Sequence, residues 1–375
     1  MCKIIFSSRK DITDKLATPL SVNRYKIRLK KPKLVGINIF KGAFNLLIHP
    51  LYLIMYFLKN NGLTMIYKKL TVTSLSLCFL FSLFINPVAL NAWNETGHKI
   101  IAAIAWDNLT PIAKENIIEI LKFAPKDSDL LTLFDKNAPS NTEQYFLNVA
   151  YWPDMVRDRN KTTRYKKYHE GSWHYIGSYW KQTSDGPIEA TGLVENENVA
   201  ERISYFQSTL ASTKVSNDVK AVQIAWVLHL IGDIHNPLHN ASRVTTKDPD
   251  GDRGGNSFAL ADKWPTNLHS FWDGIIDVNS PKNENTTSFD YYTTKAKEIS
   301  SKHPKEEFGK LIQVQDPSIW TTEGKRIVMD SLYPETLIEG QKPSIEYQEK
   351  SFEIAQQRMA LSGYRMAEFL NAIFN

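Results

Sequence analysis

The sequence predicts an all-α protein, in which residues 93–375 form one compact multi-helix domain. Apolar residues recur at spacings of three and four in five runs, which is the pattern of amphipathic helices; the runs are 98–107, 111–123, 196–213, 218–239 and 345–374. Strict alternation of apolar and polar residues, typical of strands, is scarce after Trp93. No internal repeat, low-complexity tract or clear linker divides this region.

The stretch before Trp93 has the features of a secretory signal peptide over residues 65–92. Lys68 and Lys69 precede an apolar run from Leu75 to Ile85, and the small residue Ala92 stands just before the expected cut. The alternative is a short membrane anchor, but the apolar run is short for a span of the bilayer. We therefore expect an exported protein, either periplasmic or secreted.

Residues 1–64 do not fit this scheme, because a signal peptide normally begins a protein. They hold a basic stretch over 24–33 and an apolar run from Phe44 to Leu58. One interpretation is that Met65 is the true start and that 1–64 is an upstream extension. The other is a genuine N-terminal membrane segment.

Charge is divided sharply at Trp93. Residues 1–92 hold 14 Lys and Arg against 2 Asp and Glu, a balance of +12, whereas residues 93–375 hold 31 against 38, a balance of −7. A processed chain would lack the broad basic surface of non-specific nucleic-acid binders, so any attraction for phosphate must be local. Both cysteines, Cys2 and Cys78, precede Trp93, which leaves His, Asp, Glu and backbone groups as metal ligands.

Prolines and glycines divide the helical runs. We expect four prolines to fall in connections or at helix ends; they are Pro153, Pro187, Pro237 and Pro265. Asp-Gly and Gly-Gly pairs mark a long loop at 249–256. Within it, Gly254-Gly255-Asn256 is expected to form a turn near the cleft of the functional site.

Two His/Asp pairs have the spacing of one helical turn. His229 and Asp233 lie in one helical run, and His269 and Asp273 have the same spacing, so each pair projects from one helix face. Imidazole nitrogen and carboxylate oxygen are both zinc ligands. An isolated pair could simply hydrogen-bond on a helix surface, but two pairs favour a metal site. A histidine buried among apolar neighbours, as His229 would be, also needs a partner.

Further histidines and carboxylates accompany these pairs. His239 follows Pro237, Asp154 lies in YWPDMVR, His174 lies in SWHYIG, and His98 follows Trp93 by five residues. The remaining histidines suggest less. His235 either supports His239 or faces solvent, and His169 and His303 lie in polar stretches where we expect them to be solvated.

Together these motifs resemble the family of zinc-dependent single-strand nucleases and 3′-nucleotidases, which shares its fold with bacterial zinc phospholipases C. The resemblance covers Trp93 to about Asp273. Its motifs are Trp93-x4-His98, a WPD sequence with Arg157 three residues after Asp154, His174, His229-x3-Asp233-x5-His239, and His269-x3-Asp273.

The resemblance implies a cleft that holds three Zn²⁺ ions. Asp154, His174 and His229 would hold the first ion, and His239, His269 and Asp273 the second. His98 and the free amino group and carbonyl oxygen of Trp93 would hold the third, with Asp233 bridging the first and third. The signal peptide would then have to be cut just before Trp93, because the amine does not exist until that cut.

The resemblance also implies an activity. The enzyme would be an endonuclease and 3′-nucleotidase that hydrolyses phosphodiester bonds of single-stranded DNA and RNA, using water activated by zinc, and leaves 5′-phosphates. Asp154, Asp233 and Arg157 would form the catalytic centre, with Arg157 steadying charge on the phosphate. Alone, Arg157 could equally form a surface salt bridge.

Tyr175 follows His174, where the family places an aromatic residue that stacks on a nucleobase; the alternative is a core tyrosine. Two features depart from the fungal pattern. Gly177 stands where those enzymes carry a carboxylate that reads the base edge, and the processed chain has no cysteine for a disulfide.

Two other functions fit parts of the pattern. A zinc phospholipase C would use the same metals, although its last ligand is typically Glu where this chain has Asp273. A periplasmic zinc-binding protein would need no Arg157. We expect a single-stranded nucleic acid or a 3′-nucleotide as substrate, no stable protein partner and no membrane span after processing. The choice among DNA, RNA and 3′-nucleotides stays open, as do base preference, pH optimum and oligomeric state.

Overall fold

Helix α8 (Asn217–His235) is deeply buried, because its sequence is apolar around most of its circumference. Its most extensive helix contacts are with four helices, which are α4 (Pro111–Leu121), α5 (Asn141–Met155), α7 (Val199–Ala211) and α14 (Ile345–Phe374). The computed structural model describes residues 93–375 except 193, 262 and 264. The predictions for 1–64 and for the signal peptide at 65–92 therefore lie outside the described residues.

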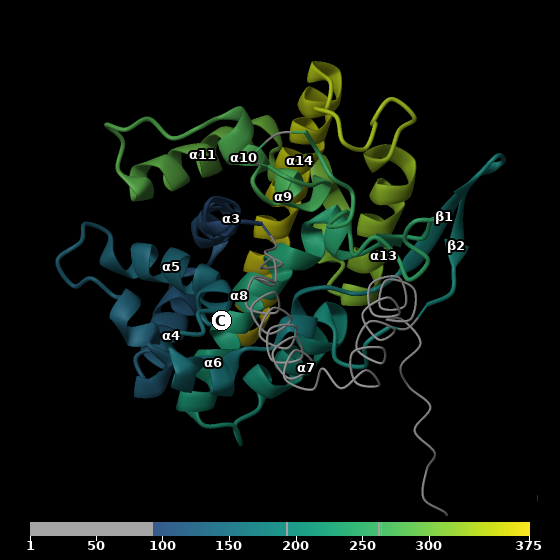
Figure 1. The fold of residues 1–375 in the computed structure, drawn as a ribbon. Helices are drawn as coiled ribbons and strands as arrows, with labels where there is room; N and C mark the ends of the chain where they lie inside the picture. Colours follow the sequence, from purple (N-terminus) through teal and green to yellow (C-terminus); the bar gives the residue numbers. More distant parts are fainter. Residues whose placement is uncertain (1–92, 193, 262, 264) are drawn as a thin grey trace, which may run out of the picture. The chain divides into compact units, whose positions relative to one another are not determined.

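The remaining helices surround α8 and α14 (Figure 1). They are α3 (Glu95–Asn108), α6 (Thr162–Tyr168), α9 (Leu268–Asp273), α10 (Ile275–Asn279), α11 (Ser288–Lys302), α12 (Lys305–Phe308) and α13 (Pro317–Ile327). Helix α3 packs against α14, α5 and α11. All described residues belong to one compact unit, and they are mainly helical, so the all-α prediction is confirmed.

Four of the five predicted helical runs match α3, α4, α7 and α14 closely. The fifth, 218–239, divides in two. Helix α8 ends at His235, and a single 3-10 turn, η4 (Pro237–His239), follows it. The side chain of Asn236 caps this turn by accepting a hydrogen bond from the Leu238 N–H at 3.2 Å. Because of this break, the side chain of His239 does not follow the helical direction of α8.

A small sheet of order β2-β1-β3 was not anticipated. Strands β1 (Tyr179–Thr183) and β2 (Gly186–Ala190) form an antiparallel hairpin, and β3 (Ser242–Arg243) pairs with β1 in parallel. The expectation that Pro187 lies in a connection or at a helix end is wrong, because it lies in β2 opposite Gln182. Strand β2 is an edge strand, where a residue without an N–H is tolerated.

A buried ion network joins α13 and α14 to the end of α8. Glu323 accepts two hydrogen bonds of 2.7 Å from Arg365 and one of 3.1 Å from Arg358. Arg365 also donates to Nε2 of His235 at 3.1 Å. Burial, followed by the charges of the two arginines, holds the pKa of His235 well below its usual value. His235 is therefore a neutral core residue, and the alternative that it faces solvent is wrong.

His303 also departs from expectation, because it is buried rather than solvated. Its Nδ1 lies 3.2 Å from Glu307, its Nε2 lies 3.4 Å from Glu353, and its carbonyl accepts a hydrogen bond from the Tyr364 hydroxyl. Helix α14 covers this polar stretch, which no local pattern indicates. His169 is half-buried.

The ion network gives a prediction about stability. Glu323→Ala leaves Arg358 and Arg365 buried without their carboxylate, so we expect the free energy of unfolding to fall by about 3 kcal/mol. Glu119→Ala, which breaks the exposed pair with Lys122, should cost less than about 1 kcal/mol. Urea denaturation of the two variants measures both values, and equal losses would contradict a structural role for the network.

Candidate metal centre

Eight histidine and aspartate side chains from six elements meet at one place beside α8. Helix α3 contributes His98, the end of α5 contributes Asp154, the 3-10 turn η3 (Gly171–His174) contributes His174, α8 contributes His229 and Asp233, η4 contributes His239, and α9 contributes His269 and Asp273. None is more than 7% exposed. The structure thus brings together every histidine and aspartate that the sequence singled out as a ligand.

Asp233 lies at the middle of the first group. One carboxylate oxygen, Oδ2, is 2.9 Å from His174 Nδ1 and 3.4 Å from His229 Nε2. The other, Oδ1, is 3.2 Å from His98 Nε2. The rings of His98 and His229 stack with centroids 3.8 Å apart, and Asp154 Oδ1 lies 3.8 Å from His229 Nε2. Three imidazoles and two carboxylates therefore share one buried volume.

The second group consists of His239, His269 and Asp273. The two imidazole rings stack with centroids 5.0 Å apart, and His269 Nε2 lies 3.4 Å from Asp273 Oδ2. Asn236 donates to Asp273 Oδ1 at 2.9 Å. The one-turn spacing on α9 and the break after α8 bring these three side chains together.

Backbone carbonyls fix the orientation of three of the imidazoles. In each case a ring Nδ1–H donates to a carbonyl, which leaves Nε2 as a lone pair directed into the group, the form that binds metals. The bonds join His229 to Ala150 at 2.9 Å, His239 to His174 at 2.6 Å and His269 to Gly254 at 2.7 Å.

Burial makes the charged forms of the side chains in this centre costly. Burial lowers the pKa of His98 to about 3, and it holds the pKa of His174 well below its usual value. Burial also raises the pKa of Asp154 to about 6 and, with the charge of Asp154, raises that of Asp233 well above its usual range. Neutral imidazoles beside carboxylates that are costly to ionise are the environment that a bound cation stabilises.

The donor atoms also fit metal ions by their positions. Three sets of side chains each place one ligand atom within 4.8 Å of the others; the sets are His98, His229 and Asp233, then Asp154, His174 and His229, then His239, His269 and Asp273. Within the described part of the chain, Nε2 of His174 and Nε2 of His239 are buried without a hydrogen bond. The residues therefore form three buried clusters that are compatible with metal sites.

Trp93 and Asn94 form hydrogen bonds to α8 and α9 beside the two groups. Its indole is fully buried and donates to the Gly232 carbonyl at 3.0 Å, and the next N–H, of Asn94, donates to the Asp273 carbonyl at 3.0 Å. A Cβ added at Gly232 would lie 2.8 Å from His98 Nδ1, so glycine is required there for the imidazole to rest on α8. The segment 93–98 is thus held across α8 at the metal centre.

Arg157 lies beside the first group. Its Nε is 3.0 Å from Asp154 Oδ1, and its side chain is 14% exposed. Its charge contributes to lowering the pKa of His98 and His174. The alternative of a surface salt bridge does not apply to Arg157, because its partner Asp154 belongs to the buried centre.

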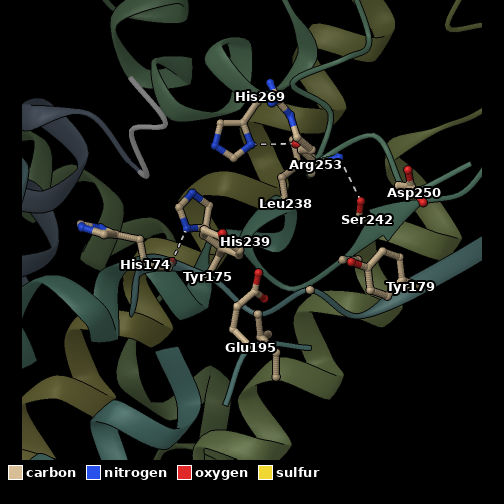
Figure 2. A pocket seen from close by; sticks show the side chains of 14 residues that line it. His174, Tyr175, Tyr179, Glu195, Leu238, His239, Ser242, Asp250, Arg253 and His269 are labelled. Carbon is tan, nitrogen blue, oxygen red and sulfur yellow. Dashed lines mark hydrogen bonds between the residues drawn. The ribbon is translucent and has the colours of Figure 1, made fainter. Parts of the chain in front are cut away.

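A cavity of about 270 Å³ adjoins the second group. His239 and His269 line one side, and Tyr175 and Gly177 line it too (Figure 2). The half-buried ring of Tyr175 is therefore not part of the closed core. Glu195 also lines the cavity. No local sequence pattern indicates Glu195, because the loop that carries it approaches the site only through the tertiary fold.

The turn at Gly254 lies at the same cavity, as expected for 249–256. Gly254 has φ of +62°, and an added Cβ would lie 2.3 Å from the Leu238 carbonyl oxygen. Only glycine fits this combination of positive φ and close backbone approach. The turn thereby places the Gly254 carbonyl where it accepts the hydrogen bond that orients His269.

Comparison with known proteins agrees with this geometry. The S1/P1 Nuclease family model matches residues 93–375. The chain is 24% identical to Nuclease S1 of Aspergillus oryzae over 75% of this chain and 91% of that protein. It is 26% identical to Endonuclease 2 of Arabidopsis thaliana over 76% of this chain and 91% of that protein. Endonuclease 4 of the same plant is 23% identical, over 76% of this chain and 89% of that protein.

These matches confirm the resemblance seen in the sequence, and they support a nuclease, a hydrolase that acts on phosphodiester bonds. The family match begins at Trp93 and includes every residue of the three buried clusters. The chain belongs to the S1/P1 nuclease family.

Proposed function

We propose that the chain from Trp93 onward is an exported, zinc-dependent endonuclease and 3′-nucleotidase. It cleaves single-stranded DNA and RNA and leaves 5′-phosphates. The observation that carries this proposal is the set of three buried His/Asp clusters in a member of a nuclease family. In the part of the chain that the structure describes, no helix is long and apolar enough to cross a membrane.

The proposal assigns one Zn²⁺ to each cluster. Asp154, His174 and His229 hold one ion, and His239, His269 and Asp273 hold another. His98 and the amino group and carbonyl of Trp93 hold the third, and Asp233 is shared between the first and third. Nitrogen and carboxylate oxygen donors in these numbers suit zinc. Three Zn²⁺ against three aspartates leave a positive centre in a region whose overall balance is −7.

Arg157 and Asp233 have different roles beside the metal ions. When bound, zinc lowers the pKa of water toward about 7 and withdraws charge from the phosphate. Arg157, already oriented by Asp154 at 3.0 Å, neutralises charge on the phosphate oxygens without reorganising during the reaction. Asp233 holds the imidazoles of His98, His174 and His229 in one arrangement through its short contacts.

The cavity beside His239 and His269 receives a nucleobase in this proposal. The ring of Tyr175 lines it and offers a stacking surface. Gly177 gives no side chain to the base edge, and the carboxylate of Glu195 lies in the same cavity (Figure 2). Glu195 therefore replaces the missing acceptor from a different part of the chain.

The first experiment measures metal and product together. Chain processed at Trp93 is incubated with single-stranded DNA or RNA, with and without a zinc chelator. We expect about three zinc ions per chain by mass spectrometry, cleavage to 5′-phosphates, and loss of cleavage on chelation that added zinc restores. A zinc-loaded chain that hydrolyses phosphatidylcholine but no nucleic acid would overturn the proposal in favour of a phospholipase C.

The role of the Trp93 amine gives a separate prediction. One alanine added before Trp93 removes the free amine from the ligand position, so this variant should bind about one zinc ion fewer than the processed chain. One alanine added after the exposed residue Asn375 is the matched control and should not change the zinc content. N-terminal sequencing first establishes the cut. Equal zinc contents in the two variants would exclude the amine as a ligand.

A third prediction concerns the role of Arg157. Arg157→Ala should lower kcat by about 100-fold, because a donor to the developing charge is lost, while the zinc content stays unchanged. Arg326→Ala, which removes an exposed arginine paired with Asp330, should leave kcat unchanged. If Arg157→Ala loses zinc in proportion to activity, the residue supports the metal centre rather than the transition state.

A further inference from the structure

Positive charge after Trp93 is concentrated in residues 157–169, here called the basic segment. It holds six cationic residues, Arg157, Arg159, Lys161, Arg164, Lys166 and Lys167, against one acid, Asp158, a balance of +5. No other stretch of this length after Trp93 has as large an excess of positive charge. Since residues 93–375 have a balance of −7, the rest of that region has a balance of −12. The segment is an exception in an acidic protein.

The basic segment lies in the chain between two residues of the metal centre, Asp154 and His174. The chain leaves the centre at Asp154, forms the turn 157–161 and helix α6, and returns at His174 (Figure 1). Helix α6 spans seven residues, so its length is only about 10 Å. The positive charge of the segment is therefore held near the metal centre.

Two of the cations serve the fold. Arg164 is buried, donates to the Met155 carbonyl at 2.7 Å and pairs with Asp129 at 3.3 Å. Lys167 pairs with Asp127 at 2.8 Å. These contacts hold α6 against the end of α5 and the region before α5.

Three other cations form no ion pair that stabilises the fold. Arg159, Lys161 and Lys166 are exposed, and none forms an ion pair with any described residue. They come from the turn 157–161 and from the outer side of α6. Exposed, unpaired cations at the edge of an active centre favour contact with an anion in solution.

An aromatic stack connects these cations to Arg157. The rings of Tyr165 and His169 stack with centroids 4.7 Å apart and an angle of 22°, and the guanidinium of Arg159 lies 5.6 Å from the Tyr165 ring centre. Burial, and then the charges of Arg157 and Arg159, lower the pKa of His169. The Tyr165–His169 stack is therefore within the electrostatic influence of both Arg157 at the metal centre and Arg159 outside it.

We propose that Arg159, Lys161 and Lys166, together with the Tyr165–His169 stack, form a subsite for the strand of a single-stranded nucleic acid beyond the cleaved bond. This inference rests on the proposed nuclease function. Cations that track phosphates beside a π-surface that takes bases without sequence preference are the features of single-strand binding.

The location of the nucleotide cavity supports this occupant. The cavity is lined by His174, His239 and His269, and no residue of the basic segment lines it. A strand with one nucleotide in the cavity and its reacting phosphate at the metals continues past Arg157 onto the basic segment. A mononucleotide ends before it reaches the segment, so the subsite distinguishes polynucleotides from 3′-nucleotides.

The test compares two triple variants with equal charge change. The first is Arg159→Gln, Lys161→Gln and Lys166→Gln. The matched control is Lys297→Gln, Lys310→Gln and Lys350→Gln, which removes three exposed cations from α11, η5 (Gly309–Gln313) and α14. Zinc-loaded proteins are assayed for KM and kcat on a long single strand and on a 3′-mononucleotide. Binding of a cleavage-resistant phosphorothioate single strand is followed by fluorescence anisotropy over a range of salt concentrations.

The first variant should raise KM for the long strand about tenfold and lower the slope of log affinity against log salt by about 2, the value for three lost contacts on a single strand. KM for the 3′-mononucleotide and kcat should stay within about twofold, and the control triple should match the unmodified protein. Equal effects of both triples on strand binding, or equal effects on the strand and the mononucleotide, would overturn the subsite. A protein that binds the strand through these residues but cleaves nothing would keep the subsite and overturn the proposed function.

Discussion

The carboxylate of Asp233, fully buried on α8, is the constraint around which the rest of the site is arranged. Its oxygens lie within 3.4 Å of imidazoles from α3, η3 and α8 itself, so three segments far apart in the sequence meet at one side chain. A carboxylate in this position is costly to ionise without a nearby cation, and burial accordingly raises its pKa. A metal ion there supplies the missing charge, which couples its binding to the packing of α3 and η3 against α8.

The sequence indicated the parts of this site that depend on local geometry. The one-turn spacing of His229 with Asp233, and of His269 with Asp273, determines that each pair shares a helix face, and the apolar surroundings of His229 indicated burial. Spacing alone does not bring the α9 pair to α8. That approach depends on the glycine turn at 254 and on the break at Pro237. The orientation of both is determined by contacts in the tertiary fold.

Elements without a local signal were missed. Helix α5 carries Asp154 but has a proline in its last turn, and the β1–β2 hairpin has no clear alternation. The burial of His235 and His303 depends on Arg365 and Glu353, which lie far along the chain. Glu195 lies at the cavity because the chain after the hairpin passes there. In each case a distant partner determines the environment, and single-sequence patterns report only near neighbours.

The imidazoles of His229, His239 and His269 are oriented by main-chain carbonyls, of Ala150, His174 and Gly254, rather than by side chains. A carbonyl is present whichever residue occupies the position, so replacing the side chain at Ala150 leaves the bond to His229 available. The requirement falls on the path of the backbone and not on the chemistry of the neighbours. Gly254 must stay glycine because of its positive φ and close backbone approach, and His174 belongs to the first group, so among the three carbonyl positions Ala150 is the one whose residue can change while the ring keeps its tautomer.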